Sequence, residues 1–175
     1  VRPGRLTIQA AVQYGERAGT AFGVDTVVVP APMGGTLAMG SLLIGSRRGR
    51  LTVRFGDGQD VPVSPGGVVQ RSDGLELAVE LFGLGPSDVA TVQVLVAPDN
   101  AYDSGIGALP QWKPFPERRG EGRVTRVAGG GAIARWRTSL PLTKLKPGSW
   151  LLAVVATDAS GREVRQEGRM EVLMP

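Results

Sequence analysis

Apolar and polar residues alternate with a period of two along most of the chain. The clearest run covers residues 75–81, where Leu and Val alternate with Glu and Ala, and the next covers residues 91–96. A period of two is typical of a strand buried on one face, whereas no segment has the 3.6-residue period and caps of a helix. We therefore expect an all-β chain with little or no helix, in which these two strands are central and form an antiparallel pair.

The same pattern predicts strands elsewhere and groups several of them into hairpins. The further predicted strands are residues 6–14, 20–29, 37–44, 51–55, 61–63, 124–127, 133–137, 150–157 and 164–173. Gly, Pro and Asp-Gly steps between neighbouring runs predict hairpins from the first two, from 51–55 with 61–63, and from the last two. Strand 150–157 is apolar on both faces, so it is expected to be a buried central strand or to carry an interface.

These elements predict an immunoglobulin-like β-sandwich with additional N-terminal strands. We place the sandwich domain at residues 49–175, because a basic turn with Arg47 and Arg48 separates it from the strands before it. Residues 1–48 are then N-terminal strands that either extend the sandwich or complete a smaller upstream β unit.

The composition argues against an enzyme. Among 175 residues there is no cysteine and no histidine, which removes thiolates, disulfides and the commonest neutral-pH base and metal ligand. Asp99, Asn100 and Asp103 bring oxygen ligands together, but their spacing misses the ligand pattern of an EF-hand. Glu76 and Glu80 lie four apart on one strand, where alternating Glu is ordinary for a solvent face. We expect no catalytic residue, no cofactor and no metal.

Charge gives a weaker restriction on partners. The net charge is +4, with a sequence pI near 10.1, yet basic residues are scattered and alternate with Glu along residues 163–171. This arrangement is typical of a solvated strand face and not of a phosphate-binding patch, so we expect no nucleic-acid partner. The same surface leaves peripheral contact with anionic lipid or with an acidic protein open.

The start of the sequence suggests processing. The chain opens with Val1 and runs directly into a strand-like segment, and no apolar stretch approaches the roughly 20 residues that span a bilayer. We expect a protein whose upstream signal or anchor lies outside this sequence. Its location would be extracytoplasmic, in the periplasm, with attachment to a membrane through a segment not shown here.

Three stretches of the chain carry a family resemblance. They are VVVPAPMGGTLAMGSLLIG (27–45), LELAVELFGLGPSDVATVQVLV (75–96) and LPLTKLKPGSWLLAVVATDASGREVRQEGRMEVL (140–173). In this order they resemble the C-terminal β region of GWxTD-domain proteins, although the GWxTD motif itself is absent from these residues. The resemblance implies an exported or membrane-attached protein of a GC-rich bacterium. One form of this expectation is an accessory subunit of a gemmatimonad photosynthetic reaction-centre complex.

The candidate functional segment is the aperiodic stretch 98–122. A connection of this length in a compact domain is usually functional or disordered, and aromatic residues and Arg are enriched at interface hot spots. The alternative is that Trp112 and Phe115 fold back over the open end of the sandwich. The residues predicted to bind a partner are Tyr102, Leu109, Trp112, Phe115, Arg118 and Arg119.

The function expected from these features is that of a non-enzymatic scaffold or accessory subunit docked on a larger extracytoplasmic or membrane-associated protein complex. The alternative is a module that binds carbohydrate or a surface polymer, in which exposed Trp and Tyr would act as stacking platforms. Trp112 would serve either function. No small-molecule substrate is expected.

Overall fold

Strands are the main secondary structure of the residues that the structure describes. The structure, a computed structural model, describes residues 4–11, 22–29, 36–54, 58–99, 109–116, 125–128 and 133–174. Within these residues the only helical element is a single 3₁₀ turn, Pro65–Gly67. The all-β prediction is therefore confirmed.

The described residues form fourteen strands. The first seven are β1 (Gly4–Ala11), β2 (Phe22–Val29), β3 (Ala38–Met39), β4 (Leu43–Ser46), β5 (Leu51–Arg54), β6 (Asp60–Val63) and β7 (Val68–Gln70). The other seven are β8 (Leu75–Phe82), β9 (Val89–Pro98), β10 (Lys113–Pro114), β11 (Thr125–Ala128), β12 (Ile133–Leu140), β13 (Gly148–Thr157) and β14 (Glu163–Leu173).

The chain divides into two compact units, residues 1–34 and 35–175. In the first unit β1 and β2 pair antiparallel from Gly4 opposite Val29 to Ala11 opposite Phe22, as the sequence predicts for a hairpin. The expected boundary at 48/49 placed β3 and β4 among the N-terminal strands, which were expected either to extend the sandwich or to complete an upstream β unit. In the structure both strands pair with β8 in the second unit, because their apolar residues add to the core there.

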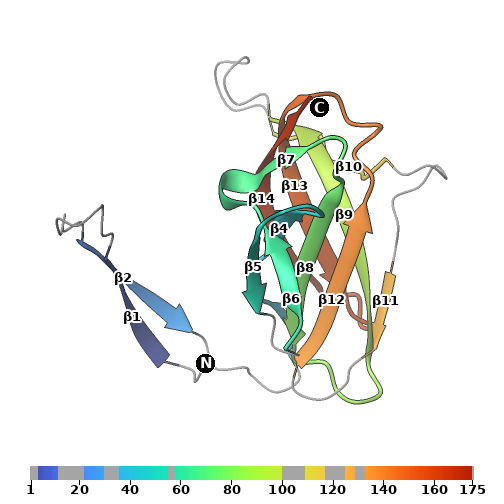
Figure 1. Cartoon of the computed structure of the whole chain (residues 1–175). Coiled ribbons are helices and arrows are strands. Elements are labelled where there is room, and N and C mark those ends of the chain that lie inside the picture. Colours follow the sequence, from blue (N-terminus) through green and yellow to red (C-terminus); the bar gives the residue numbers. More distant parts are fainter. Residues whose placement is uncertain are drawn as a thin grey trace. The chain divides into compact units, whose positions relative to one another are not determined.

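The described residues of the second unit form two larger sheets and the two-stranded hairpin β5–β6 (Figure 1). One has six strands in the order β10-β9-β13-β14-β7, with β11 also paired to β9, and the other has four, with β8 between β12 and the pair β3 and β4. One hydrophobic core joins them, because it takes the inward residues of β8 and β12 from one sheet and those of β9, β13 and β14 from the other. The two sheets therefore pack as the layers of a β-sandwich.

The predicted pairing of the two clearest strands is wrong. Both are central, but β8 pairs with β12 and β4, whereas β9 pairs with β13 in the other sheet. The chain between them crosses from one layer to the other, so their apolar faces meet across the core instead of lying side by side. Period-two alternation identifies the buried face of a strand but not its neighbour.

A hairpin of β5 and β6 lies against the outer face of the four-stranded sheet. Val61 of β6 is completely buried against Ala78 of β8, and Leu43 packs on the same small cluster. The backbones of β4 and β6 approach each other closely at Gly45. Only glycine fits there, since a Cβ on Gly45 would lie 1.9 Å from the carbonyl oxygen of Pro62. The hairpin predicted from the sequence is confirmed. It covers part of the outer face of β8, which the alternating pattern of that strand predicted to be exposed to solvent.

Strand β13 is central, which the apolar residues on both its faces predicted. It pairs with β9 on one side and β14 on the other. Leu152 and Val154 point into the core, while Ala153 and Val155 face outward and are still buried, with 0% and 7% of their surface exposed. The outer face of the six-stranded sheet is therefore also covered along its middle.

Candidate functional site

Residues 109–116 of the predicted docking segment lie along one edge of the six-stranded sheet. They contain β10, which places Lys113 opposite Val96 and Pro114 opposite Leu95 of β9. The backbone N–H of Phe115 donates to the carbonyl oxygen of Val94 at 2.9 Å. These backbone contacts position the side chains that follow and precede β10.

Phe115 belongs to the core. Its side chain is 1% exposed and packs in the cluster between the two sheets. A ring with no accessible surface cannot contact a partner in the folded protein. Phe115 is therefore not part of the candidate docking surface. For this residue the alternative holds, in which the side chain folds back onto the sandwich.

Trp112 lies on the other face of the sheet. It precedes Phe115 by three residues in extended chain, so the two side chains point to opposite sides. The guanidinium of Arg165, on the outward face of β14, lies over the Trp112 ring with 4.1 Å from its carbon to the ring centroid. Trp112 is half-buried, and one face of its ring is occupied by this cation.

Arg165 packs against the Trp112 ring with incomplete hydrogen bonding. Its Nε lies 2.7 Å from Oε1 of Glu167, an ion pair in which the N–H is not directed at the oxygen. Nε and one terminal nitrogen are buried without a hydrogen-bond acceptor. Buried donors nearly always have a hydrogen-bond acceptor in folded proteins. The two unsatisfied nitrogens of Arg165 are therefore an unusual feature of this cluster.

Leu109 provides exposed apolar surface near Trp112 in the chain. Its side chain is 87% exposed, the largest value among the big apolar residues that the structure describes. Tyr102, Arg118 and Arg119, the other predicted partner-binding residues, lie outside the described residues. The described candidate site therefore consists of Leu109, Trp112 and Arg165.

Asp99 forms a second charged pair on this sheet. Its side chain is 7% exposed, and Oδ2 lies 3.2 Å from Nε of Arg169 on β14. The other oxygen, Oδ1, is buried without a hydrogen-bond donor. The arginine already balances the carboxylate that the calcium hypothesis would use, whereas Asn100 and Asp103 lie outside the described residues. No group of three or more potential metal ligands occurs in the described part of the chain.

The paired glutamates of β8 are bound to arginines of β12. Glu80 Oε1 lies 3.3 Å from Nε of Arg135, and Glu76 Oε2 lies 3.4 Å from Nε of Arg137. Glu76 is 4% exposed, although the alternation predicted a solvent face. Carboxylates engaged in this way hold two strands together and do not form a free acid and base pair.

Sequence reasoning missed Arg165 as a member of the site. The alternating charges of residues 163–171 indicate a solvated face. Only the pairing of β14 with β13, and of β13 with β9, places this arginine on the same sheet as Trp112, with β13 between the two strands that flank it. A signal was available for Trp112 itself. It precedes Phe115 by three positions, and in extended chain an odd spacing predicts opposite faces.

Comparisons with known proteins give no family. No family model and no curated protein matches the chain. Among solved structures it is similar to the alkylpurine DNA glycosylase AlkC of Pseudomonas fluorescens bound to DNA containing an abasic site analog, with 12% identity, a TM-score of 0.38, and coverage of 78% of this chain and 30% of that one. It is also similar to a family 123 glycoside hydrolase from Clostridium perfringens, with 14% identity, a TM-score of 0.37, and coverage of 79% and 28%.

The chain thus spans less than a third of either matched structure. Likenesses at this level of identity and TM-score say nothing about activity. Within the described residues, no helix combines the length and the apolar character that a membrane crossing needs.

Proposed function

We propose that this chain is a non-enzymatic scaffold or accessory subunit that docks on a larger extracytoplasmic or membrane-associated protein complex. The observation that carries the proposal is the position of Trp112, which lies outside the sandwich under the guanidinium of Arg165 and not in the core. Leu109, three residues before it, adds an almost fully exposed apolar side chain.

The chemistry of these side chains supports a protein partner. Trp and Arg are enriched at interface hot spots, where a rigid aromatic ring fills a pocket and loses little conformational entropy. Pro110 and Pro114 stiffen the same segment, which lowers the entropy lost on docking. The partner would offer an apolar pocket for Leu109 and Trp112, and carboxylates that complement the net charge of +4.

The experiment compares variants of the full chain purified from the native source with partners attached. Leu109→Asp should abolish stoichiometric co-purification of membrane subunits, because it puts a charge into an apolar contact. Trp112→Ala should weaken it by on the order of 2 kcal/mol. Leu51→Asp is the matched control, since Leu51 is 56% exposed on the separate β5–β6 hairpin.

Two results would overturn this proposal. One is that Leu109→Asp and Leu51→Asp co-purify with the same subunits in the same amounts as the unaltered chain. The other is retention of the chain on immobilised polysaccharide that depends on Trp112, which would favour the carbohydrate-binding function instead.

We also propose that the sandwich is of the immunoglobulin-like type. This is supported by its strand orders, because β4-β8-β12 and β9-β13-β14 correspond to the A-B-E and C-F-G arrangement of that fold. The chain also passes from the edge of one sheet to the edge of the other, since β4 pairs with β8 while β7 pairs in parallel with β14.

A further inference from the structure

A hollow of about 360 Å³ opens between two turns that flank the four-stranded sheet. One wall is formed by residues 71–74, just before β8, and the other by residues 139–143, at the end of β12 and after it. Arg47, from the turn after β4, completes the lining. Arg71 connects the two walls, because its guanidinium donates a hydrogen bond to the carbonyl oxygen of Thr143.

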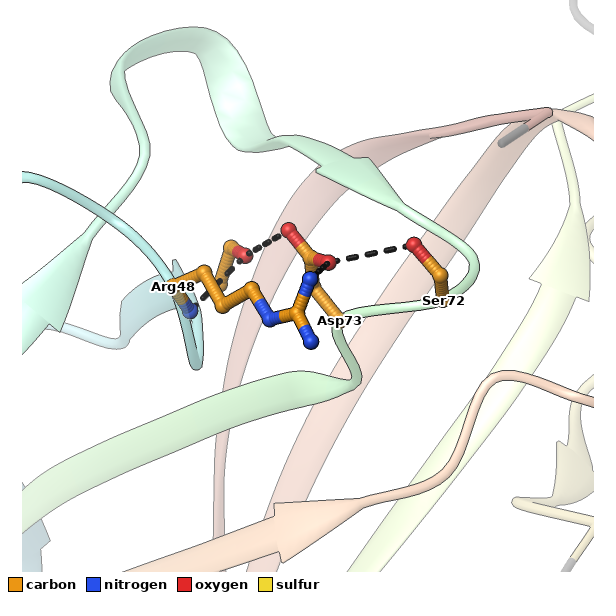
Figure 2. A network of polar contacts seen from close by, with 4 residues as sticks. Arg48, Ser72 and Asp73 are labelled. Atoms are coloured by element: carbon orange, nitrogen blue, oxygen red, sulfur yellow. Dashed lines mark hydrogen bonds and ion pairs between the residues drawn. The ribbon is translucent and has the colours of Figure 1, made fainter.

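Asp73 is the only carboxylate among the lining residues, and its charge is already compensated (Figure 2). Oδ1 accepts a hydrogen bond from the Ser72 hydroxyl at 3.1 Å and lies 3.8 Å from the guanidinium of Arg48. Oδ2 accepts from the Ser46 hydroxyl at 3.2 Å. Arg48 therefore offsets the charge of Asp73 and two hydroxyls hydrogen-bond to its oxygens, which weakens the repulsion between this carboxylate and an anion in the hollow.

The same network fixes the turn that carries Arg47. The Ser46 hydroxyl, which donates to Asp73, also accepts from the N–H of Arg48 at 3.4 Å, and the Gly49 N–H donates to the Ser46 carbonyl at 2.8 Å. Ser46 is 7% exposed, so the start of the turn is anchored in the fold. Arg47 is exposed and, within the described residues, forms no ion pair and no hydrogen bond.

Arg47 and Arg71 are thus two cations that face one hollow with no free carboxylate beside them. The hydroxyls of Ser139 and Thr143 add short donors to the same lining, whereas the Ser72 hydroxyl already donates to Asp73. A guanidinium binds phosphate and carboxylate oxygens with its planar set of N–H groups, and hydroxyls complete such sites. The volume lies at the lower end of the range for small-ligand pockets.

We propose that this hollow is a binding site for a small oxyanion, a phosphate monoester or a carboxylate, with Arg47 and Arg71 as its cationic groups. Asp73 acts as a positioning residue, because it holds the Arg47 turn against the wall at residues 71–74. The site uses none of the residues of the docking surface, so it stands or fails independently of the proposed function.

The experiment measures the melting temperature of the full chain with inorganic phosphate or acetate, against chloride at the same ionic strength. Phosphate, acetate or both should raise it, because a ligand bound only to the folded state stabilises that state. The anion that acts identifies which of the two groups the site takes. Backbone amide NMR signals of residues 71–74 and 139–143 should shift with the same anion.

Arg47→Ala should weaken this binding about tenfold or more and leave the melting temperature without anion unchanged, since Arg47 is exposed. Arg50→Ala is the matched control, because Arg50 lies just after the same turn but does not line the hollow. Equal effects of the anion on both variants and the unaltered chain would overturn the proposal, as would no effect beyond that of chloride.

Discussion

The guanidinium of Arg165 lies over the ring of Trp112, 4.1 Å from its centroid, on the outside of the six-stranded sheet. The two residues come from opposite edges of the three central strands, because Trp112 precedes β10 next to β9, whereas Arg165 lies on β14. Their contact therefore spans β13, whose outward residues Ala153 and Val155 are almost completely buried.

This contact should appear as a coupling free energy in a double-mutant cycle. Trp112→Ala and Arg165→Met each remove the cation–ring pair, so the loss in unfolding free energy of the double variant should be smaller than the sum by about 1 kcal/mol. Urea unfolding measures the four free energies. The same cycle with Arg54→Met, on the distant hairpin strand β5, should give no coupling, and equal couplings in both cycles would contradict a direct contact.

Phe115 and Leu109 should differ sharply in their effect on stability. Phe115→Ala empties a core site that is 1% exposed and should lower the free energy of unfolding by about 3–5 kcal/mol. Leu109→Ala removes a side chain that is 87% exposed and should change it by no more than about 0.5 kcal/mol. Denaturant midpoints of the two variants test this, and a large loss for Leu109→Ala would place that residue in a packed contact.

Gly45 should not tolerate even a methyl group. In Gly45→Ala the new Cβ would meet the backbone of Pro62, whose carbonyl oxygen is 1.9 Å away, so β6 must move off the sheet. The shift would break the hydrogen bond from the Ser64 N–H to the Ile44 carbonyl, now 2.9 Å long. We expect a loss of roughly 1–3 kcal/mol or more in unfolding free energy.

Gly40 offers the matched control. A Cβ there would have its nearest neighbour, an atom of the Phe82 ring, at 3.4 Å, which is an ordinary contact. Gly40→Ala should therefore be neutral or stabilise the fold by up to about 1 kcal/mol, through the unfolded chain. Similar losses for both variants in thermal unfolding would show that backbone crowding at Gly45 is not the cause.

The fold could be predicted from the sequence as far as local pattern determines it. Alternation identified β8, β9 and β14 and the faces they turn to the core, a run apolar on both faces identified β13, and turn residues identified the hairpins. Which strands pair could not be read in the same way, because a period of two is satisfied by any neighbour that covers the same face. That is why β8 and β9 were expected side by side and instead lie in opposite layers.

The site was predictable only in part for a related reason. Trp112 and Phe115 have the composition of a hot spot, but their burial depends on which face each takes against β9. Glu76 was expected in solvent, and it is buried on the face that receives the β5–β6 hairpin. Each of these outcomes depends on contacts between residues far apart in the chain, which local periodicity does not contain.

The loop between β13 and β14 should make stability depend on pH through Asp158. The hydrogen bond from the Ser160 hydroxyl to its carboxylate, at 2.6 Å, is the main reason that the pKa of Asp158 lies below its ordinary value. The backbone N–H groups of Ser160 and Arg162 donate to the same oxygen at 2.9 and 3.0 Å and lower the pKa further. The carboxylate thus organises the turn in its charged form.

A lowered pKa fixes the sign of the effect. The folded state binds the proton of Asp158 less tightly than the unfolded state, so this contribution to stability is complete above the ordinary aspartate pKa. It is lost as the pH falls through the lower pKa of the folded state. Asp158→Asn should therefore be less stable than the unaltered chain near neutral pH, and the difference should shrink on acidification.

NMR titration of the Asp158 carboxyl carbon provides the direct measurement. Its midpoint should lie below the ordinary aspartate value in the unaltered chain and should rise in Ser160→Ala, which removes the strongest hydrogen bond but keeps both backbone donors. Because Asp158 is exposed to solvent, added salt should reduce only the part of the shift that comes from the charge of Arg162. A midpoint that Ser160→Ala leaves in place would assign the shift to the backbone N–H groups alone and would contradict the role given to the hydroxyl.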